Sequence, residues 1–533
     1  MRSPWLSREY NKSTDVKVKK VKDKYILSNQ KLKTSLELTE KEYVKYENNL
    51  FNEIDWEKLY LRGLAKDNNC TELVIDESFY NENINYIKSK KVQSFILNVD
   101  KEKFHILINP ELGSWIALTE EEKERYEKSK LTKDEWLSLF LRGLAENENN
   151  QELELDFPIP AEYPSVIVVN ITTGCNLRCK YCFADCGPFK GENMTEDVMD
   201  ATIHSMLSMP EIKVTSFEFQ GGEASTNVPG IRKFIEKVEA VKHKYDKQVK
   251  YRTEINCISV TDDLISLIKK YNIALGISLD GPKDMNDQVR VDIDGKGSFD
   301  RIEKGVKKLR ENGLYIDGTV CTVGQHNVHH PRELMKFYNE MGMNFKPRPV
   351  NILGREKEYN LTTRPGEWAE CFKKMHAMRD EIDIENFSIH IHEENVYTPI
   401  RDYICLRFPC GAARELVSVN PNGDVFPCDG FKGEESFVMG NVLNETIEKM
   451  LKKSNIVELR SRTAETIEKC SRCMFKGMCC SCCYSAFGAF GDIYREDPHC
   501  EDRKQMYIYL MEAWIRKNVL NIKEVKNEQS VNC

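Results

Sequence analysis

The sequence of 533 residues lacks any apolar run that approaches the ~20 residues of a membrane-spanning helix. It also lacks a positive net charge, because 85 acidic residues against 77 basic ones give a formal charge of −8, which disfavours a sequence-independent nucleic-acid binder. Residues 1–20 carry basic charges but no following apolar stretch, so we expect no secretory signal. These absences predict a soluble, cytoplasmic protein with no membrane or nucleic-acid partner.

Cysteine, in contrast, is abundant, with 19 residues. Thiols in a reducing compartment rarely pair as disulfides, so we expect regularly spaced cysteines to bind metals or clusters. A hydrophobic content of 41% and a charged content of 30% are ordinary for a globular protein. The length predicts about three domains.

An internal repeat occupies the N-terminal part of the chain. Residues 24–65 and 104–145 resemble each other at a constant offset of 80 residues. The segment LRGLA at 61–65 recurs at 141–145, and Trp56 recurs as Trp136. We therefore expect two copies of one small module.

The second copy has clear local signals. The segment KFHILINPELGSWIAL, residues 103–118, places a turn signal between two apolar runs and predicts a β-hairpin. Thr119 with Glu122 and Thr132 with Glu135 are capping boxes, which predict two helices after the hairpin.

Hairpin plus short helices resembles the RiPP recognition element (RRE), a winged-helix module of about 45 residues that binds leader peptides of ribosomally made precursors. The resemblance implies that a peptide adds as a strand to the edge of one hairpin. The first copy differs at residues 29–30 and 33–35, so we expect it to be degenerate. The alternative is that both copies are structural modules that pack on a catalytic domain.

An apolar run at residues 165–170 leads into Cys175, Cys179 and Cys182, a CxxxCxxC pattern followed by Phe183. Three thiolates on one loop can bind three irons of a [4Fe–4S] cluster and leave the fourth iron for another ligand. A zinc site is the alternative, and it would need a fourth ligand such as Cys186. The segment resembles the defining motif of the radical S-adenosylmethionine (SAM) superfamily.

The next strand-like run ends in Gly221-Gly222-Glu223, which resembles the segment that binds the SAM amino group in that superfamily. Glycines here let the backbone approach a ligand closely. Arg290 has a structural ion pair as its alternative, and the neighbours of Asn256 depart from the family pattern. The resemblance implies cofactor-binding roles for Gln220, Gly221, Gly222, Glu223, Asn256, Ser278, Asp280 and Arg290.

Strand and helix patterns alternate from residue 165 to about 350, which predicts parallel βαβ units and an α/β fold. The resemblance makes this a partial (β/α)6 TIM-like barrel. We predict five segments: RRE-like repeats at 1–80 and 81–155, the radical SAM barrel at 156–395, a cysteine-rich domain at 396–510, and a C-terminal helix and tail at 511–533.

Seven C-terminal cysteines follow one template, which also requires Gly423 between the first two. It resembles the SPASM domain, which houses two auxiliary [4Fe–4S] clusters, and it spans roughly residues 400–505. The cysteines are Cys410, Cys428, Cys470, Cys473, Cys479, Cys483 and Cys500. A zinc site of the four cysteines from 470 to 483 is the alternative.

The resemblance implies a ligand set for each auxiliary cluster. The distal cluster would take Cys470, Cys473, Cys479 and Cys500. The cluster nearer the barrel would take Cys410, Cys428 and Cys483, with Cys405 as the available fourth ligand. If Cys405 does not bind, the open iron would be able to bind a substrate thiolate. Cys480 and Cys482 are surplus thiols or alternative ligands.

Sequence around the SPASM cysteines resembles peptide maturases that make thioether crosslinks, as the SCIFF maturases and ranthipeptide synthases do. The resemblance implies SAM and three [4Fe–4S] clusters as cofactors, a precursor peptide with a leader as substrate, and ferredoxin or flavodoxin as electron donor. Anaerobic sulfatase maturases are an alternative, because they place an aspartate after the second SPASM cysteine, where Asp429 is the candidate catalytic residue. A noncatalytic iron–sulfur scaffold or redox sensor is the alternative from another class.

Overall fold

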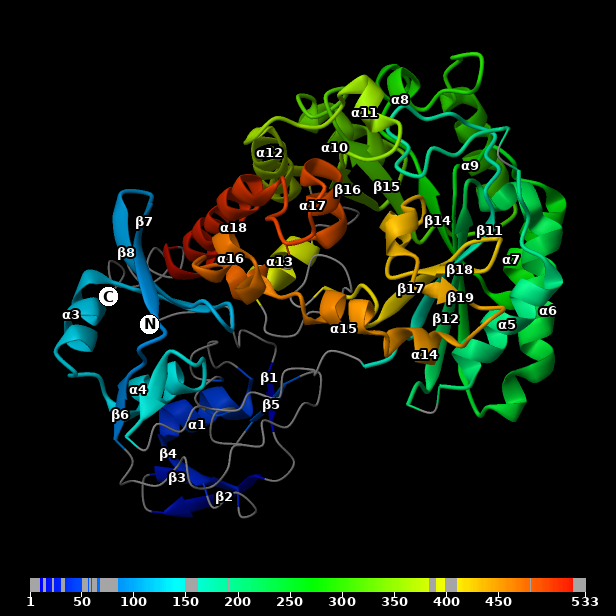
Figure 1. The fold of residues 1–533 in the computed structure, drawn as a ribbon. Coiled ribbons are helices and arrows are strands. Elements are labelled where there is room, and N and C mark those ends of the chain that lie inside the picture. Colours follow the sequence, from blue (N-terminus) through cyan, green and yellow to red (C-terminus); the bar gives the residue numbers. More distant parts are fainter. Residues whose placement is uncertain are drawn as a thin grey trace. The chain divides into compact units, whose positions relative to one another are not determined.

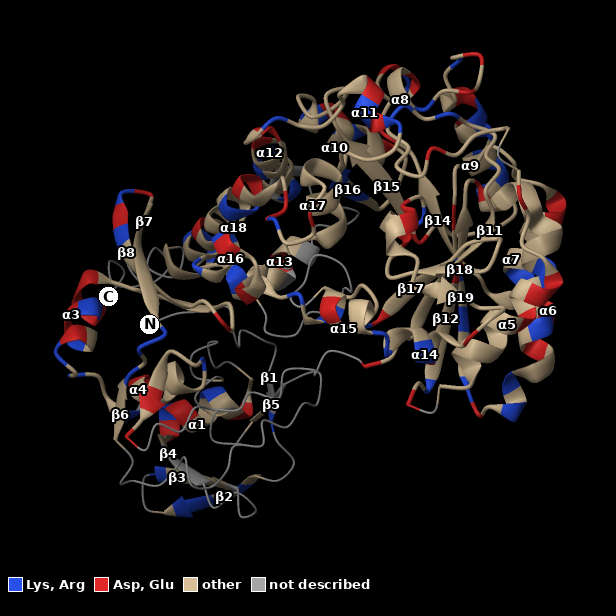
Figure 2. Ribbon diagram, in the orientation of Figure 1, with Lys and Arg blue, Asp and Glu red and all other residues tan. Residues whose placement is uncertain are grey.

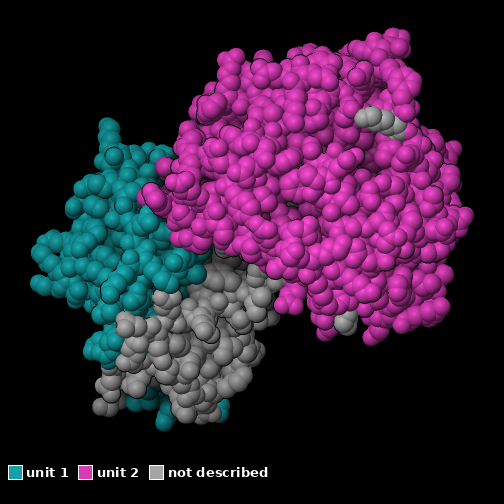
Figure 3. All heavy atoms as spheres, in the orientation of Figure 1, with its two compact units in different colours: residues 1–157, 393–400, 510–533 teal, residues 158–392, 401–509 magenta. Residues whose placement is uncertain are grey.

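The structure is a computed structural model that describes residues 10–12, 16–21, 24–29, 34–49, 56, 59, 65–67, 85–148, 162–189, 191–209, 211–382, 390–397, 410–479 and 481–520. The chain forms two compact units (Figure 3). Unit 1 contains residues 1–157, 393–400 and 510–533, and unit 2 contains residues 158–392 and 401–509. Among the described helices, none combines the length and apolar character that crossing a membrane requires.

The first repeat in unit 1 is built on a three-stranded antiparallel sheet in the order β2-β3-β4 (Figure 1). Its elements are β1 (Tyr10–Lys12), β2 (Val16–Val21), β3 (Lys24–Asn29), β4 (Thr34–Thr39), α1 (Glu40–Glu47) and β5 (Ala65–Asp67). Leu27, Leu38, Tyr46 and Trp56 form its core.

The second repeat has the same plan. It contains β6 (Tyr86–Lys88), β7 (Gln93–Val99), β8 (Glu102–Asn109), β9 (Ser114–Leu118), α3 (Glu120–Glu127), α4 (Lys133–Phe140) and β10 (Ala145–Asn147). The predicted hairpin is β8-β9, and both predicted capping boxes are formed. Sequence reasoning did not identify β7, which pairs with β8 and makes the sheet three-stranded.

Equivalent aromatic pairs show why the repeat keeps its spacing. The rings of Tyr46 and Trp56 are 5.9 Å apart in the first copy, and those of Tyr126 and Trp136 are 5.9 Å apart in the second. The offset of 80 residues therefore preserves a core contact between the first helix and the segment after it.

Trp115 gives the second copy an anchor to a distant part of the chain. Its side chain is fully buried, its Nε1 donates to the Val396 carbonyl oxygen at 2.7 Å, and its ring meets Trp514 edge-on at 5.7 Å. Val396 belongs to α13 (His390–Tyr397) and Trp514 to α18 (Cys500–Ile515). Residue 35 of the first copy, which corresponds to Trp115, is serine.

Unit 2 contains six parallel strands in the order of the chain, which confirms the predicted α/β barrel of parallel βαβ units. The strands are β11 (Val166–Thr172), β12 (Val214–Gly221), β13 (Gln248–Ile255), β14 (Ala274–Ser278), β15 (Gly318–Val323) and β16 (Phe345–Pro349). The covering helices are α5 (Glu196–Leu207), α6 (Val228–Val241), α7 (Asp262–Tyr271), α8 (Lys283–Val289), α9 (Phe299–Glu311) and α10 (Pro331–Glu340).

Alternation along these strands sorts apolar from polar side chains. Phe217 and Phe219 of β12 are fully buried, whereas Glu218 and Gln220 between and beside them are partly exposed. Helices α5, α6 and α7 cover one side of the sheet in Figure 1. Polar side chains therefore line the opposite side of β12, where a ligand has access.

The barrel sheet continues into the cysteine-rich region. Strand β17 (Leu416–Val419) pairs in parallel with β11, and β18 (Asp424–Phe426) and β19 (Gly440–Asn441) extend the sheet. The remaining helices of unit 2 are α11 (Glu356–Tyr359), α12 (Glu367–Ile382), α14 (Ile447–Leu451), α15 (Ser454–Ser461), α16 (Glu468–Ser471) and α17 (Cys483–Phe490). The residues after Cys410 thus lie beside the strand that leads to the CxxxCxxC loop.

Candidate active site and cluster sites

The CxxxCxxC loop follows β11 and is fixed by backbone hydrogen bonds. Cys175 N donates to Gly187 O at 3.3 Å, Arg178 N donates to Val291 O at 2.7 Å, and Lys180 N donates to Val289 O at 2.9 Å. None of the cysteines that the structure describes forms a disulfide. The three thiols of the motif are partly buried on one loop, as the spacing predicted.

The environment of these thiols fits a bound metal cluster. Burial raises the pKa of Cys179 to about 11, and it raises that of Cys175 with further contributions from Glu223 and Cys179. A hydrogen bond from the Cys186 thiol instead lowers the pKa of Cys182 to about 6. Because burial opposes thiolate formation at two of the three sites, iron would supply the positive charge that keeps them ionised.

Arg355 organises the same loop and was not anticipated from the sequence. Its Nη1 donates to Cys179 O at 2.6 Å, and its Nη2 donates to Cys186 O at 2.7 Å and to Asp185 Oδ1 at 2.8 Å. Its side chain is 2% exposed. Gly354, at φ 57°, allows this approach, because a Cβ there would overlap the carbonyl oxygens of the loop.

The two glycines of the Gly-Gly-Glu segment pack against the chain that enters the cysteine loop. Gly222 N donates to Thr172 O at 2.9 Å, and Glu223 N donates to Gly174 O at 2.8 Å. A Cβ on Gly221 would overlap Thr172 O, and a Cβ on Gly222 would overlap Gly174 O. These glycines therefore set the distance between β12 and the cysteine loop, in addition to any role beside a ligand.

Glu223 and Asn256 join the same framework. One carboxylate oxygen of Glu223 accepts from Ser225 N at 3.0 Å and the other accepts from Asn256 N at 2.7 Å. Asn256 Nδ2 donates to Asn176 Oδ1 in the cysteine loop at 2.6 Å. Burial raises the pKa of Glu223, and the Ser225 and Asn256 hydrogen bonds oppose that rise.

The other predicted SAM contacts lie at the ends of β14 and α8. Asp280 is fully buried and accepts from the Tyr181 hydroxyl and from Thr322 N. Arg290 Nη1 donates to the Tyr181 hydroxyl at 2.6 Å and lies 3.9 Å from Asp280 Oδ2. Ser278 Oγ donates to Glu254 at 2.8 Å. Asp280 and Arg290 thus hold Tyr181 of the cysteine loop through an ion pair, the alternative considered for Arg290.

Asp429 lies next to the SAM motif in a buried polar network. Its Oδ2 accepts from Lys432 Nζ at 3.0 Å, and its Oδ1 accepts from Ser418 Oγ at 3.1 Å and Asn170 Nδ2 at 3.2 Å. Lys432 Nζ also donates to Gly221 O at 3.1 Å. Burial alone would lower the pKa of Lys432, but Asp429 and the nearby cysteine thiolates raise it above its usual value.

The three cysteines assigned to the barrel-side cluster share an apolar pocket. Cys410, Cys428 and Cys483 pack with Phe426 and Phe431. A hydrogen bond to the Cys483 thiol and burial raise the pKa of Cys410. Cys405 and Cys480 lie outside the described residues.

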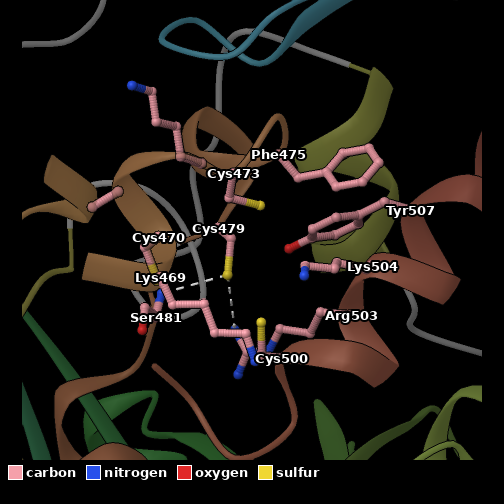
Figure 4. A pocket seen from close by; sticks show the side chains of 12 residues that line it. Lys469, Cys470, Cys473, Phe475, Cys479, Ser481, Cys500, Arg503, Lys504 and Tyr507 are labelled. Carbon is pink, nitrogen blue, oxygen red and sulfur yellow. Dashed lines mark hydrogen bonds between the residues drawn. The ribbon is translucent and has the colours of Figure 1, made fainter. Parts of the chain in front are cut away.

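The four cysteines assigned to the distal cluster line one cavity (Figure 4). The cavity is bounded by Cys470, Cys473, Cys479 and Cys500, together with Lys469, Arg503, Lys504 and Tyr507. Cys483 is not part of this lining and lies instead with Cys410. This grouping matches the predicted ligand set and not the alternative zinc set of residues 470 to 483.

A single-ion site is a poor description of these thiols. Within the described ranges, no three His, Cys, Asp or Glu side chains are placed to hold one metal ion. Zinc requires four ligands about 2.0 to 2.3 Å from one point. A cubic cluster instead takes one thiolate at each iron, so its ligands are spread around a larger centre.

Comparisons with known proteins agree with this site. The radical SAM superfamily model matches residues 169–338, and an iron–sulfur cluster-binding domain model, SPASM, matches residues 410–474. A cysteine-type anaerobic sulfatase-maturating enzyme of Clostridium perfringens (strain ATCC 13124) is 23% identical over 328 residues, which cover 59% of this chain and 87% of that enzyme. The radical SAM cyclopropyl synthase TigE of Paramaledivibacter caminithermalis is 23% identical over 463 residues, which cover 79% of this chain and 87% of that enzyme.

Among solved structures, native anSMEcpe with bound AdoMet is similar to 66% of this chain, with a TM-score of 0.57 and 18% sequence identity, and 99% of that chain is covered. At this identity the likeness shows a shared fold. It agrees with the six parallel strands and with their continuation into β17.

Proposed function

The chain is a radical SAM enzyme that carries a SPASM domain, and from this premise we propose that it matures a ribosomally made precursor peptide by closing a thioether crosslink. When bound, SAM and its cluster supply one-electron chemistry that removes a hydrogen atom from an unactivated carbon. The protein's part is to hold that carbon and the acceptor thiol in reach of each other. The product is two hydrogens lighter: one leaves the carbon as an atom, and the thiol gives up a proton while one electron passes to an auxiliary cluster.

One observation carries this proposal: the match to the cyclopropyl synthase covers 79% of the chain. Residues 158–533 make up only about 71% of the chain, so that match includes part of the N-terminal repeats. The sulfatase-maturating enzyme covers 59%. The relative that shares the N-terminal region is thus named for ring closure, which joins atoms of a substrate as a thioether does.

The cofactor set that we propose is SAM with three [4Fe–4S] clusters. Cys175, Cys179 and Cys182 would hold the cluster that binds SAM. Lys432 and Asp429 would fix the SPASM region beside Gly221 of the SAM motif. The distal and barrel-side cysteine sets would hold the other two clusters, with Cys405 as the proposed fourth ligand of the barrel-side one. An electron donor of the ferredoxin or flavodoxin class would reduce the SAM-binding cluster.

The second N-terminal copy is the proposed site for the leader peptide, as an RRE-like module. Its sheet has the order β7-β8-β9, so β7 is an outer strand. Every residue of β9 is buried, whereas Ile96 of β7 is 54% exposed. An extended peptide would therefore add to β7 through main-chain hydrogen bonds.

The outer strands of the two copies differ in charge. Strand β2 presents Lys17, Lys19 and Lys20 to solvent (Figure 2), and lysines on an edge strand oppose pairing with another chain. Strand β7, with the sequence QSFILNV, has no charged residue. This contrast supports the second copy as the peptide site and the first as degenerate.

A formylglycine-forming activity is the second candidate, because sulfatase-maturating enzymes are among the relatives and Asp429 follows the second SPASM cysteine. The contacts of Asp429 argue against it as a general base. Both of its carboxylate oxygens accept hydrogen bonds, and Lys432 pairs with one of them. A base must be within reach of the proton that it abstracts, and here the protein occupies both oxygens.

Anaerobic incubation of the reconstituted enzyme with SAM, a reductant and the neighbouring gene's cysteine-containing peptide tests the proposal. We expect 5′-deoxyadenosine and a peptide lighter by two hydrogens per crosslink, with one alkylatable thiol lost each time. Two hydrogens lost with an oxidised seryl or cysteinyl side chain and no C–S bond would establish the second candidate. No deoxyadenosine with any substrate would leave a noncatalytic cluster scaffold.

A further inference from the structure

One sulfur in the distal cavity receives two N–H donors. Ser481 N donates to Cys479 Sγ at 3.5 Å, and Arg503 Nη1 donates to the same sulfur at 3.9 Å. Figure 4 shows both donors converging on Cys479 from opposite parts of the cavity wall. Arg503 lies in the first turn of α18, three residues after Cys500, so it is fixed next to another proposed ligand.

Asp497 holds both donors in place. Its Oδ2 accepts from Arg503 Nη2 at 2.8 Å, and the two side chains are 1% and 7% exposed. Its backbone N donates to Ser481 Oγ at 3.1 Å, and its Oδ1 accepts from His499 N at 2.8 Å. One nitrogen of the guanidinium thus faces the carboxylate while another faces the sulfur.

Hydrogen bonds and positive charge beside cluster sulfurs stabilise the additional negative charge of the reduced cluster. A guanidinium keeps its charge at every pH at which proteins fold. Its burial matters, because solvent and salt screen a buried charge much less than an exposed one. Arg503 is the buried cation of this cavity that donates to a thiolate, and it has a fixed orientation.

The two lysines of the cavity wall are placed differently. The side chain of Lys469 is 47% exposed and pairs with Glu496 and Glu501. The side chain of Lys504 is 30% exposed and pairs with Glu501. Their charges are offset by carboxylates and screened by water, so we expect them to affect a cluster less than Arg503 does.

We propose that Arg503, positioned by Asp497, raises the reduction potential of the cluster held by Cys470, Cys473, Cys479 and Cys500. The cluster is then easier to reduce by one electron, as is required if it accepts the electron that ring closure releases. The inference rests on the proposed distal cluster, and Arg503 acts through the sulfur of Cys479 rather than on substrate.

The test is a redox titration followed by electron paramagnetic resonance. The full chain with Cys175, Cys179 and Cys182 replaced by alanine removes the SAM-binding cluster, and Cys470→Ala in the same background identifies the distal signal by its loss. In this background Arg503→Gln should favour the oxidised distal cluster by about tenfold, which is a shift of about 59 mV to more negative potential for one electron. The barrel-side signal should keep its potential.

Two further variants separate tuning from a general disturbance. Arg503→Lys keeps a cation for Asp497 but lacks the second nitrogen that reaches the sulfur, so its potential should fall between those of Arg503 and Arg503→Gln. Lys504→Gln removes a partly exposed charge one residue further along α18 and should shift the potential less than Arg503→Gln does.

An unchanged distal potential in Arg503→Gln and Arg503→Lys, with full iron content, would overturn the inference and leave the proposed function intact. Equal shifts in Arg503→Gln and Lys504→Gln would also overturn it, because the effect would then be long-range charge alone. If Arg503→Gln does not load iron, Arg503→Lys carries the test. If Cys470→Ala loses no iron, the distal cluster itself is wrong.

Discussion

Lys432 Nζ lies 3.0 Å from Asp429 Oδ2, and the same ammonium donates to the Gly221 carbonyl oxygen of the SAM motif at 3.1 Å. Its third acceptor is Asn170 Oδ1 at 3.3 Å. All three protons of one buried lysine are thus used to join the cysteine-rich region to two neighbouring barrel strands. This contact couples the geometry of the SPASM region to that of the SAM site.

Replacing Lys432 by methionine should destabilise the chain. The substitution leaves Asp429 in a buried position without its cation, and breaking a buried pair costs about 3 to 5 kcal/mol. We expect a lower midpoint of thermal unfolding and a loss of at least about tenfold in deoxyadenosine formation. Lys452→Met is the matched control, because Lys452 is 64% exposed and pairs only with Glu448 on the surface. Equal stability of the two variants would contradict the role of Lys432.

The pH dependence of this pair has a definite sign. The pKa of Lys432 is raised above its usual value of 10.5 in the folded chain. Its contribution to stability is therefore fully present below pH ~10.5 and is lost only as the pH rises through the higher folded value. Denaturant titrations of wild type and Lys432→Met should keep a constant difference from pH 6 to 9 and converge only at strongly alkaline pH.

Gly222→Ala should damage the cysteine loop through a steric overlap. The added Cβ would meet Gly174 O, a backbone atom that cannot move without displacing Cys175. Overpacking of this kind costs typically about 1 to 3 kcal/mol. Iron bound per chain should fall because the SAM-binding cluster is lost, while the auxiliary clusters remain.

Gly318→Ala is the control for that experiment. Gly318 is also in a barrel strand, but a Cβ there would meet no atom within 4 Å. We expect full iron content and nearly unchanged stability. If both alanine variants lose iron equally, the close approach of Gly222 to the loop does not explain the need for glycine.

Arg355→Gln should weaken cluster assembly rather than the barrel. The guanidinium satisfies the carbonyl oxygens of Cys179 and Cys186, and glutamine cannot reach both acceptors and Asp185 at once. We expect a reduced signal of the SAM-binding cluster after reconstitution, with the auxiliary signals and far-ultraviolet circular dichroism preserved. Arg332→Gln, an exposed position on α10, should have no effect. A full SAM-binding signal in Arg355→Gln would remove the role that we assign to this residue.

What the sequence predicted well was local. Thr119 with Glu122 and Thr132 with Glu135 are capping boxes within one turn, so no tertiary information was needed to place those helix starts. The cysteine spacings were equally local, and so was the alternation of strands and helices in the barrel. The grouping of Cys500 with Cys470 came from the family resemblance.

The contacts that sequence reasoning missed join residues far apart in the chain. Asn170 meets Ser418, 248 residues away, because β17 extends the barrel sheet beside β11. Arg355 reaches back 176 residues to Cys179. No short pattern marks such residues, since an arginine after a strand looks the same whether it faces solvent or a cluster loop. The Arg503 and Asp497 pair was missed for the same reason.

Ile96→Asp should weaken binding of the leader peptide. Ile96 lies on the outer strand β7 and is 54% exposed, so a charge there should cost the fold little while opposing the addition of another strand. We expect at least about tenfold weaker affinity for a fluorescent leader peptide, with deoxyadenosine formation in the absence of peptide unchanged. Ile87→Asp is the matched control, because Ile87 is 43% exposed but lies on β6, which pairs with β10 instead. Equal losses in both variants would indicate a nonspecific effect of charge, and unchanged affinity in Ile96→Asp would place the leader elsewhere on the chain.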